Sequence, residues 1–182
     1  MGIEASYRRI NAAEWGRLQH LQEFYSTLDG FSRYEAYASI ADSDEFRSSD
    51  RYVTIDKDWH ALHVLLTGEI SNPSAIQPAP PPLGNVVTGG TETLIDATYG
   101  KVRFLKPEEV REVADALSRI TVQDLKARFD PIAFTAAQVY PNPRPGGWNI
   151  EELEPLLWVY PQLVGFFRDA AREGDVVLLS FD

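Results

Sequence analysis

The strongest constraint on the fold of this 182-residue chain is a strand-like pattern at each end. Near the start, Ile3, Ala5 and Tyr7 alternate with polar residues, which predicts a strand over residues 2–10 with one buried face. Near the other end, the apolar run Val176–Leu179 is typical of a strand that is buried on both faces. We expect these two strands to pair. We therefore predict an α+β fold with a mixed or antiparallel sheet that includes both terminal strands and packs against several α-helices.

Apolar residues at helical spacing indicate several helices between these strands. Asp56 is placed to cap one helix and Gly68 to end it, and Pro107 stands in the first turn of another. We expect Pro161 to kink or restart the last helix, and residues 31–51 to form an exposed excursion with one short helix. The predicted helices cover approximately residues 12–28, 57–66, 107–117, 122–129, 131–140 and 153–173.

Residues 71–90 are rich in proline and glycine, which excludes an α-helix there. We predict a long loop with room for a short strand at Val86-Val87, followed by extended structure over residues 93–105. The loop is not a linker between domains, because neither side of it carries enough of a core to fold alone. We therefore predict a single domain over residues 1–182.

The chain has no cysteine. Disulfides, zinc ribbons, cysteine-ligated clusters and thiol nucleophiles are thereby excluded, and the composition fits a reducing cytoplasm. The first residues lack the positively charged start and apolar run of a signal peptide, and no window approaches the roughly 20 apolar residues of a membrane span. We therefore expect a cytoplasmic protein that does not associate with membranes.

The formal net charge is −10, from 27 acidic and 17 basic residues. Such a field repels phosphate backbones, and the basic residues are scattered, so we expect no binding to nucleic acid. An acidic surface favours solubility, and it would also complement a basic protein partner. Neither the identity of such a partner nor an oligomeric state follows from the sequence.

Several short segments carry a family resemblance. The most specific one runs from Asp56 to Gly68 and contains Trp59-His60-Ala61-Leu62-His63. On these segments the chain resembles the YfbM-like family, a group of bacterial proteins of unknown function. The resemblance implies an α+β domain and no established activity. The other matching segments are Met1-Gly2, Tyr99–Leu105 with Pro107–Val110, Arg128–Pro131, Val139–Pro141 with Trp148, and Ala170–Asp175.

The histidines of that segment are the first candidates for chemistry. On a helix, His63 shares the apolar face with Trp59, and His60 lies about 60° further round. Asp56, His60 and His63 could surround one point as a two-histidine, one-carboxylate metal site, or as a carboxylate-oriented pair for acid–base catalysis. However, Asp56 is suited to the helix cap, and a buried histidine more often packs its ring. The spacing also differs from that of zinc proteases, so we predict no bound metal.

Other residues are candidates for a pocket or a binding groove. Glu69 and Thr67 adjoin the end of this helix and could line a pocket mouth with His63. Tyr140 and Trp148 flank a loop of prolines and glycines, where they would either floor a binding groove or form a hydrophobic lid on the core. Trp59 is a third aromatic candidate for ligand contact. Glycine-rich phosphate loops and the Gly-x-Ser-x-Gly elbow are absent, so we predict no cofactor.

Two hypotheses of function follow. The first is a non-enzymatic binding protein, one form of which is an immunity-type protein that neutralises a basic partner. It rests on the acidic charge and on the lack of a specific catalytic motif. The alternative is an enzyme of unspecified reaction whose pocket contains His60, His63 and Glu69, with Tyr140 nearby. It requires these side chains to converge around a cleft.

Overall fold

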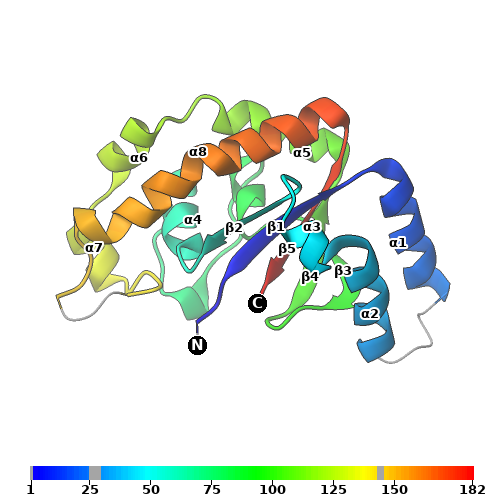
Figure 1. Cartoon of the computed structure of the whole chain (residues 1–182). Coiled ribbons are helices and arrows are strands. Elements are labelled where there is room, and N and C mark those ends of the chain that lie inside the picture. The colour runs from blue at the N-terminus through cyan, green and yellow to red at the C-terminus, as the bar shows by residue number, and fades with distance from the viewer. Residues whose placement is uncertain (1, 25–29, 143–145) are drawn as a thin grey trace.

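The computed structural model describes residues 2–24, 30–142 and 146–182. Its strands are β1 (Ala5–Ile10), β2 (Tyr52–Asp56), β3 (Thr91–Asp96), β4 (Lys101–Leu105) and β5 (Val176–Phe181). They form one antiparallel sheet in the order β2-β1-β5-β4-β3 (Figure 1). β1 and β5 are neighbours, paired from Ala5 opposite Phe181 to Ile10 opposite Val176. The prediction that both terminal strands belong to one sheet is confirmed.

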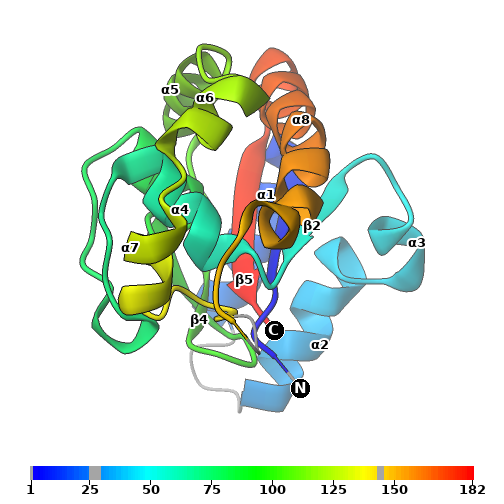
Figure 2. The same ribbon diagram turned by 90° about the vertical axis from the view of Figure 1, so that its left-hand side faces the viewer.

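Helices cover both faces of this sheet, which confirms the α+β fold (Figure 2). Because side chains alternate along a strand, Val177 and Leu179 of β5 enter one apolar cluster, and Val176 and Leu178 enter another. The second, smaller cluster is covered by α1 (Ala12–Phe24), α2 (Gly30–Ala41) and α3 (Asp44–Arg47). The larger one is covered by α4 (Trp59–Thr67), α5 (Pro107–Leu117), α6 (Val122–Arg128), α7 (Pro131–Ala136) and α8 (Ile150–Glu173).

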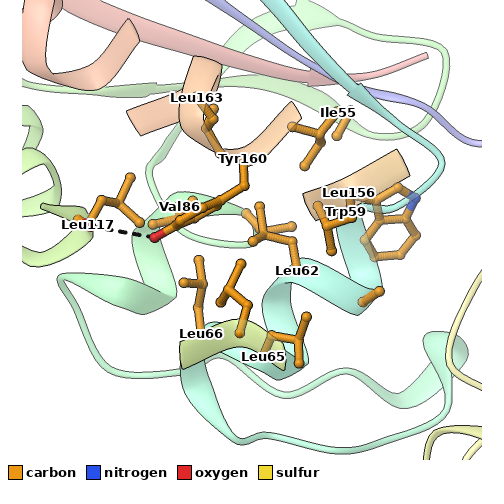
Figure 3. Packing of buried hydrophobic residues seen from close by; sticks show 14 of the residues in the cluster. Ile55, Trp59, Leu62, Leu65, Leu66, Val86, Leu117, Leu156, Tyr160 and Leu163 are labelled. Carbon is orange, nitrogen blue, oxygen red and sulfur yellow. Dashed lines mark hydrogen bonds between the residues drawn. The ribbon is translucent and has the colours of Figure 1, made fainter. Parts of the chain in front are cut away.

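The larger cluster fills the space between α4, α5, α8 and the sheet. Figure 3 shows Leu62 and Leu66 of α4 pointing toward the ring of Tyr160 on α8. Tyr160 is buried, and its hydroxyl donates to the carbonyl oxygens of Ile120 at 3.1 Å and Leu117 at 3.4 Å. Because its polar atom has acceptors, the ring can occupy the core without leaving a hydroxyl unsatisfied. Tyr160 thereby joins α8 to the end of α5.

α8 continues through both of its prolines. The helix begins after Asn149, whose side chain accepts from two amides of the first turn, and ends at Gly174 in the left-handed conformation. The expected kink or restart at Pro161 does not end the helix, which runs unbroken from Ile150 to Glu173. Pro155 and Pro161 both face solvent, where water can satisfy the carbonyl that lost its amide donor. In the ranges described, no helix has an apolar stretch long enough to cross a bilayer.

The region 31–51 differs from its prediction. Instead of an exposed excursion with one short helix, it contains most of the 12-residue α2 and the four-residue α3. Tyr37, Ala41 and Phe46 bury their side chains in the smaller cluster. Few residues of this segment turn inward, so its helical period is weak in the sequence.

The proline-rich loop also differs in part from its prediction. Residues 71–90 contain no α-helix, as predicted, but they form two 3₁₀-helices, η2 (Pro73–Ala75) and η3 (Leu83–Val86). The prediction of a short strand at Val86-Val87 is wrong, because both valines are buried in the core and do not pair with the sheet. The carbonyl oxygen of Val86 accepts the hydroxyl of Tyr7 at 2.8 Å, which ties the loop to β1.

A buried ion pair fastens the end of α2 to the sheet. Arg8 of β1 is 1% exposed and pairs with Asp42, which directly follows α2. Nη1 of Arg8 donates to the hydroxyls of Ser6 and Ser180 at 2.9 Å each. Asp42 also accepts from Arg47 of α3 at 2.8 Å. The guanidinium is therefore both paired and hydrogen-bonded, which is the condition under which a charge can be buried.

We predict that Asp42→Ala lowers the free energy of unfolding by about 3–5 kcal/mol, because it leaves the buried guanidinium of Arg8 without its anion. Asp44→Ala removes an exposed carboxylate nearby and should change the stability by less than about 0.5 kcal/mol. Urea unfolding followed by circular dichroism measures both variants. Equal stabilities for the two variants would contradict the assigned role of the ion pair.

Candidate functional site

α4, which carries the candidate histidines, begins two residues later than predicted. Asp56 is not its N-cap: β2 stays paired with β1 up to Asp56, whose backbone then turns with a φ of 52°. Asp58 takes the cap position, without a side-chain capping bond. The end of α4 at a left-handed Gly68 is as predicted. Within the described ranges, no group of three His, Cys, Asp or Glu side chains is arranged to hold a metal ion.

His60 is fully buried and bonded to the backbone of a distant segment. Its Nδ1 accepts the amide hydrogen of Tyr140 at 3.1 Å, and its ring stacks on Trp59 with centroids 5.4 Å apart. Accepting at Nδ1 fits a neutral ring with its proton on Nε2. Burial lowers the pKa of His60 to about 4, and the neighbouring His63 adds to the effect. His60 is therefore uncharged at neutral pH, and it holds the loop after α7 against α4.

His63, one turn further along α4, is also fully buried. Its Nε2 lies 3.5 Å from Oε2 of Glu69, which is an ion-pair distance but too long for a well-formed hydrogen bond. Burial lowers the pKa of His63, although the Glu69 carboxylate acts in the opposite direction. Glu69 also accepts from the hydroxyl of Ser71 at 3.1 Å. The structure thus brings His63 and Glu69 together, as the pocket hypothesis requires.

A hollow of about 400 Å³ lies at the C-terminal end of α4, but the histidines do not reach it. Thr67 lines the hollow, whereas His60, His63 and Glu69 do not. Neither histidine has exposed surface, so a substrate in this hollow would not touch them. The lining consists of Val64–Gly68, Ile70, Arg128, Asp130 and Phe134.

Trp59 and Tyr140 pack against the start of the chain. The indole nitrogen of Trp59 donates to the carbonyl oxygen of Ile3 at 3.1 Å, and the amide of Ile3 donates to the Tyr140 hydroxyl at 2.8 Å. The two rings lie 5.5 Å apart. This pair therefore clamps the segment that leads into β1, which is the geometry of a lid on the core.

Trp148 is buried in a similar way. It is 4% exposed, donates from its indole to the carbonyl oxygen of Val139 at 2.9 Å and meets Phe134 edge to face. It also borders a recess of about 540 Å³ on α7. The other lining residues of this recess are uncharged: Pro131, Ile132, Thr135, Ala136 and Gly146.

The solvent-facing side of α8 carries a feature that the sequence analysis missed. Trp158 is 75% exposed, and Pro155 and Pro161, three residues to either side, are exposed as well. We call these three residues the apolar ridge. Glu151 and Glu154 are exposed on its N-terminal side, and no ion pair of the described residues involves either of them. The available signal was that Trp158 falls outside the apolar stripe of α8.

A groove of about 260 Å³ between α8 and β2 lies beside the ridge. Both of its carboxylates already pair with arginines. Asp169 pairs with Arg168 at 3.4 Å and Arg172 at 3.0 Å, and Asp50 pairs with Arg9 at 3.4 Å. The carboxylates of the groove are therefore less available to a cationic ligand than those beside the ridge.

The fold is that of an α+β protein in which the side chains of His60, Trp59 and Trp148 form hydrogen bonds with the protein's own backbone. The chain belongs to the family described as domain of unknown function (DUF1877), which it matches over residues 1–180. It is also similar to the crystal structure of a protein of unknown function, YfbM from Escherichia coli. The TM-score is 0.65 at 20% sequence identity, over 98% of this chain and 99% of that one. The resemblance to YfbM-like proteins is confirmed. No protein among the curated sequences matches this chain.

We predict that His60 makes the folded state less stable as the pH falls from about 6.5 towards 4. Its pKa is about 4 in the folded protein, below the 6.5 of an unperturbed histidine, so unfolding takes up a proton in this interval. The stabilising contribution is complete above pH 6.5 and is lost at up to about 1.4 kcal/mol per pH unit below it. His60→Asn, whose amide oxygen can still accept from Tyr140, should flatten the pH profile of urea unfolding. His20→Asn, at an exposed position, is the control for the loss of a histidine.

Asp58 should show the opposite pH dependence. Burial raises its pKa to about 6, with additional contributions from Asp56 and Glu152. Because the folded-state value lies above the ordinary 3.8, its stabilising contribution is present at low pH and lost as the pH rises through 6. We predict that Asp58→Asn raises the free energy of unfolding by about 1–2 kcal/mol at pH 7.5 and has little effect at pH 4. Asp115→Asn, at an exposed position of α5, is the control for a lost charge.

Proposed function

We propose that this protein is a binding protein whose α8 face docks a basic protein partner. The observation that carries the proposal is the apolar ridge of Pro155, Trp158 and Pro161, set beside carboxylates that have no ion pair in the described structure. A tryptophan at the centre of an interface is among the strongest anchors known, because its large ring leaves water on binding. Trp158 is positioned to provide that anchor.

The two prolines of the ridge support the proposal. A proline inside a helix costs about 3 kcal/mol relative to alanine. Both prolines face solvent, so burial in the core does not offset this cost. A rigid apolar side chain on the surface favours binding, since it loses little conformational entropy when a partner covers it.

Charge supports a basic partner in particular. Glu151 and Glu154 adjoin the ridge, and the whole chain carries a net charge of −10. Such a potential speeds the encounter with a cationic surface and discriminates against acidic proteins. An immunity-type role, in which the partner is a basic toxin, is the narrowest form of the proposal and rests on this charge.

The alternative of an enzyme with His60, His63 and Glu69 in its pocket has less support. Acid–base catalysis requires the catalytic group to reach its substrate, directly or through one water. Both histidines lack exposed surface, and His60 is engaged with the backbone of Tyr140. We therefore favour a binding role, exercised by residues 1–182 as one domain in the bacterial cytoplasm.

We predict that the tagged full chain captures a protein of high isoelectric point from a lysate of its native host, and that Trp158→Ala weakens this complex at least about 30-fold. The partner is identified by mass spectrometry, purified and titrated by calorimetry. Ile132→Ala is the matched control, because Ile132 is 82% exposed but lies on α7. Raising the salt concentration should weaken the complex.

Two results would count against the proposal. One is capture of no basic protein at native salt. The other is a complex whose affinity is the same for Trp158→Ala and the wild type, because the partner would then dock on another face.

A further inference from the structure

We infer that the α8 face recognises an arginine side chain of the partner, which stacks on the indole of Trp158 and pairs with the carboxylate of Glu154. The inference rests on the proposed function, and it names the chemical group that the ridge binds.

The spacing of the two residues brings them to one place. Glu154 and Trp158 are four residues apart on α8, so their Cβ atoms lie about 6 Å apart on the same side of the helix. Helical side chains lean toward the N-terminus, which carries the indole over the turn that contains Glu154 and Pro155. Figure 1 shows α8 on the outside of the molecule, and Trp158 is 75% exposed. A planar group can therefore approach the face of the ring.

The carboxylate of Glu154 is available to a cation. It is exposed and forms no ion pair with any described residue. The arginines of the same helix, Arg168 and Arg172, lie 14 and 18 positions further along α8, which corresponds to about 21 and 27 Å of helix. Both of them already pair with Asp169. Glu151, one turn before Glu154, adds a second negative charge.

The combination of a ring and a neighbouring carboxylate favours arginine over lysine. A guanidinium is planar, weakly hydrated and able to stack on tryptophan while its edge donates two parallel hydrogen bonds to a carboxylate. An ammonium group is compact and strongly hydrated, so it gains less from the same surroundings.

The test compares hexa-arginine and hexa-lysine peptides as probes of the isotope-labelled full chain, by NMR titration at about 150 mM salt. Hexa-arginine should bind at least about fivefold more tightly and shift the indole N–H signal of Trp158, which Trp158→Phe assigns. Trp158→Leu keeps an apolar side chain and Glu154→Gln keeps the shape, yet each should abolish the preference for arginine. Glu108→Gln on α5 removes the same charge elsewhere, and Ile132→Ala removes another exposed apolar side chain; both should retain the preference.

The outcomes separate this inference from the proposed function. Equal affinity for the two peptides, still dependent on Trp158, would overturn the arginine site and leave the docking face in place. Binding that is insensitive to both Trp158→Leu and Glu154→Gln would also overturn the inference, and the capture of a basic partner then decides the proposed function independently. All four substituted side chains are exposed, and circular dichroism confirms that each variant is folded.

Discussion

The pairing of β1 with β5 is the interaction on which the rest of the structure depends. It joins the two ends of the chain in six consecutive residue pairs and gives the sheet its centre, to which β2 is added on one side and β4 and β3 on the other. Because side chains alternate along a strand, the same pairing divides the apolar residues into two clusters. α1, α2, α3, α5 and α8 pack directly on the sheet, whereas α6 packs on α4 and α8.

The cluster at the start of α4 depends on this pairing as well. Trp59 packs against Phe181 at the end of β5, with ring centroids 5.0 Å apart, and bonds to Ile3 just before β1. His60 then accepts the amide of Tyr140, which fastens the loop after α7 to the same point. The segment with the most suggestive chemistry in the sequence therefore stabilises the end of the sheet, while the feature best suited to binding lies on the outer side of α8.

The predictions that succeeded depend on local chemistry. Gly68 ends α4 and Pro107 opens α5, because a left-handed glycine and a first-turn proline need only their immediate neighbours. Asp56 was mispredicted as a cap because strand pairing with β1 competes for the same residue. α2 was missed because its few inward residues, such as Tyr37, gain their importance from contacts with distant strands.

The sequence by itself determined the α+β class, the strands at both chain ends, the approximate positions of most helices and the negative charge. These properties depend on backbone preferences, on hydrophobic period and on composition, all of which can be recognised in a single sequence. Only the tertiary structure decided that His60 and His63 are buried and that Trp158 is exposed. Burial depends on which distant elements cover a helix face. The bond to His60 comes from Tyr140, 80 residues further along the chain, and no local pattern encodes a contact of that range.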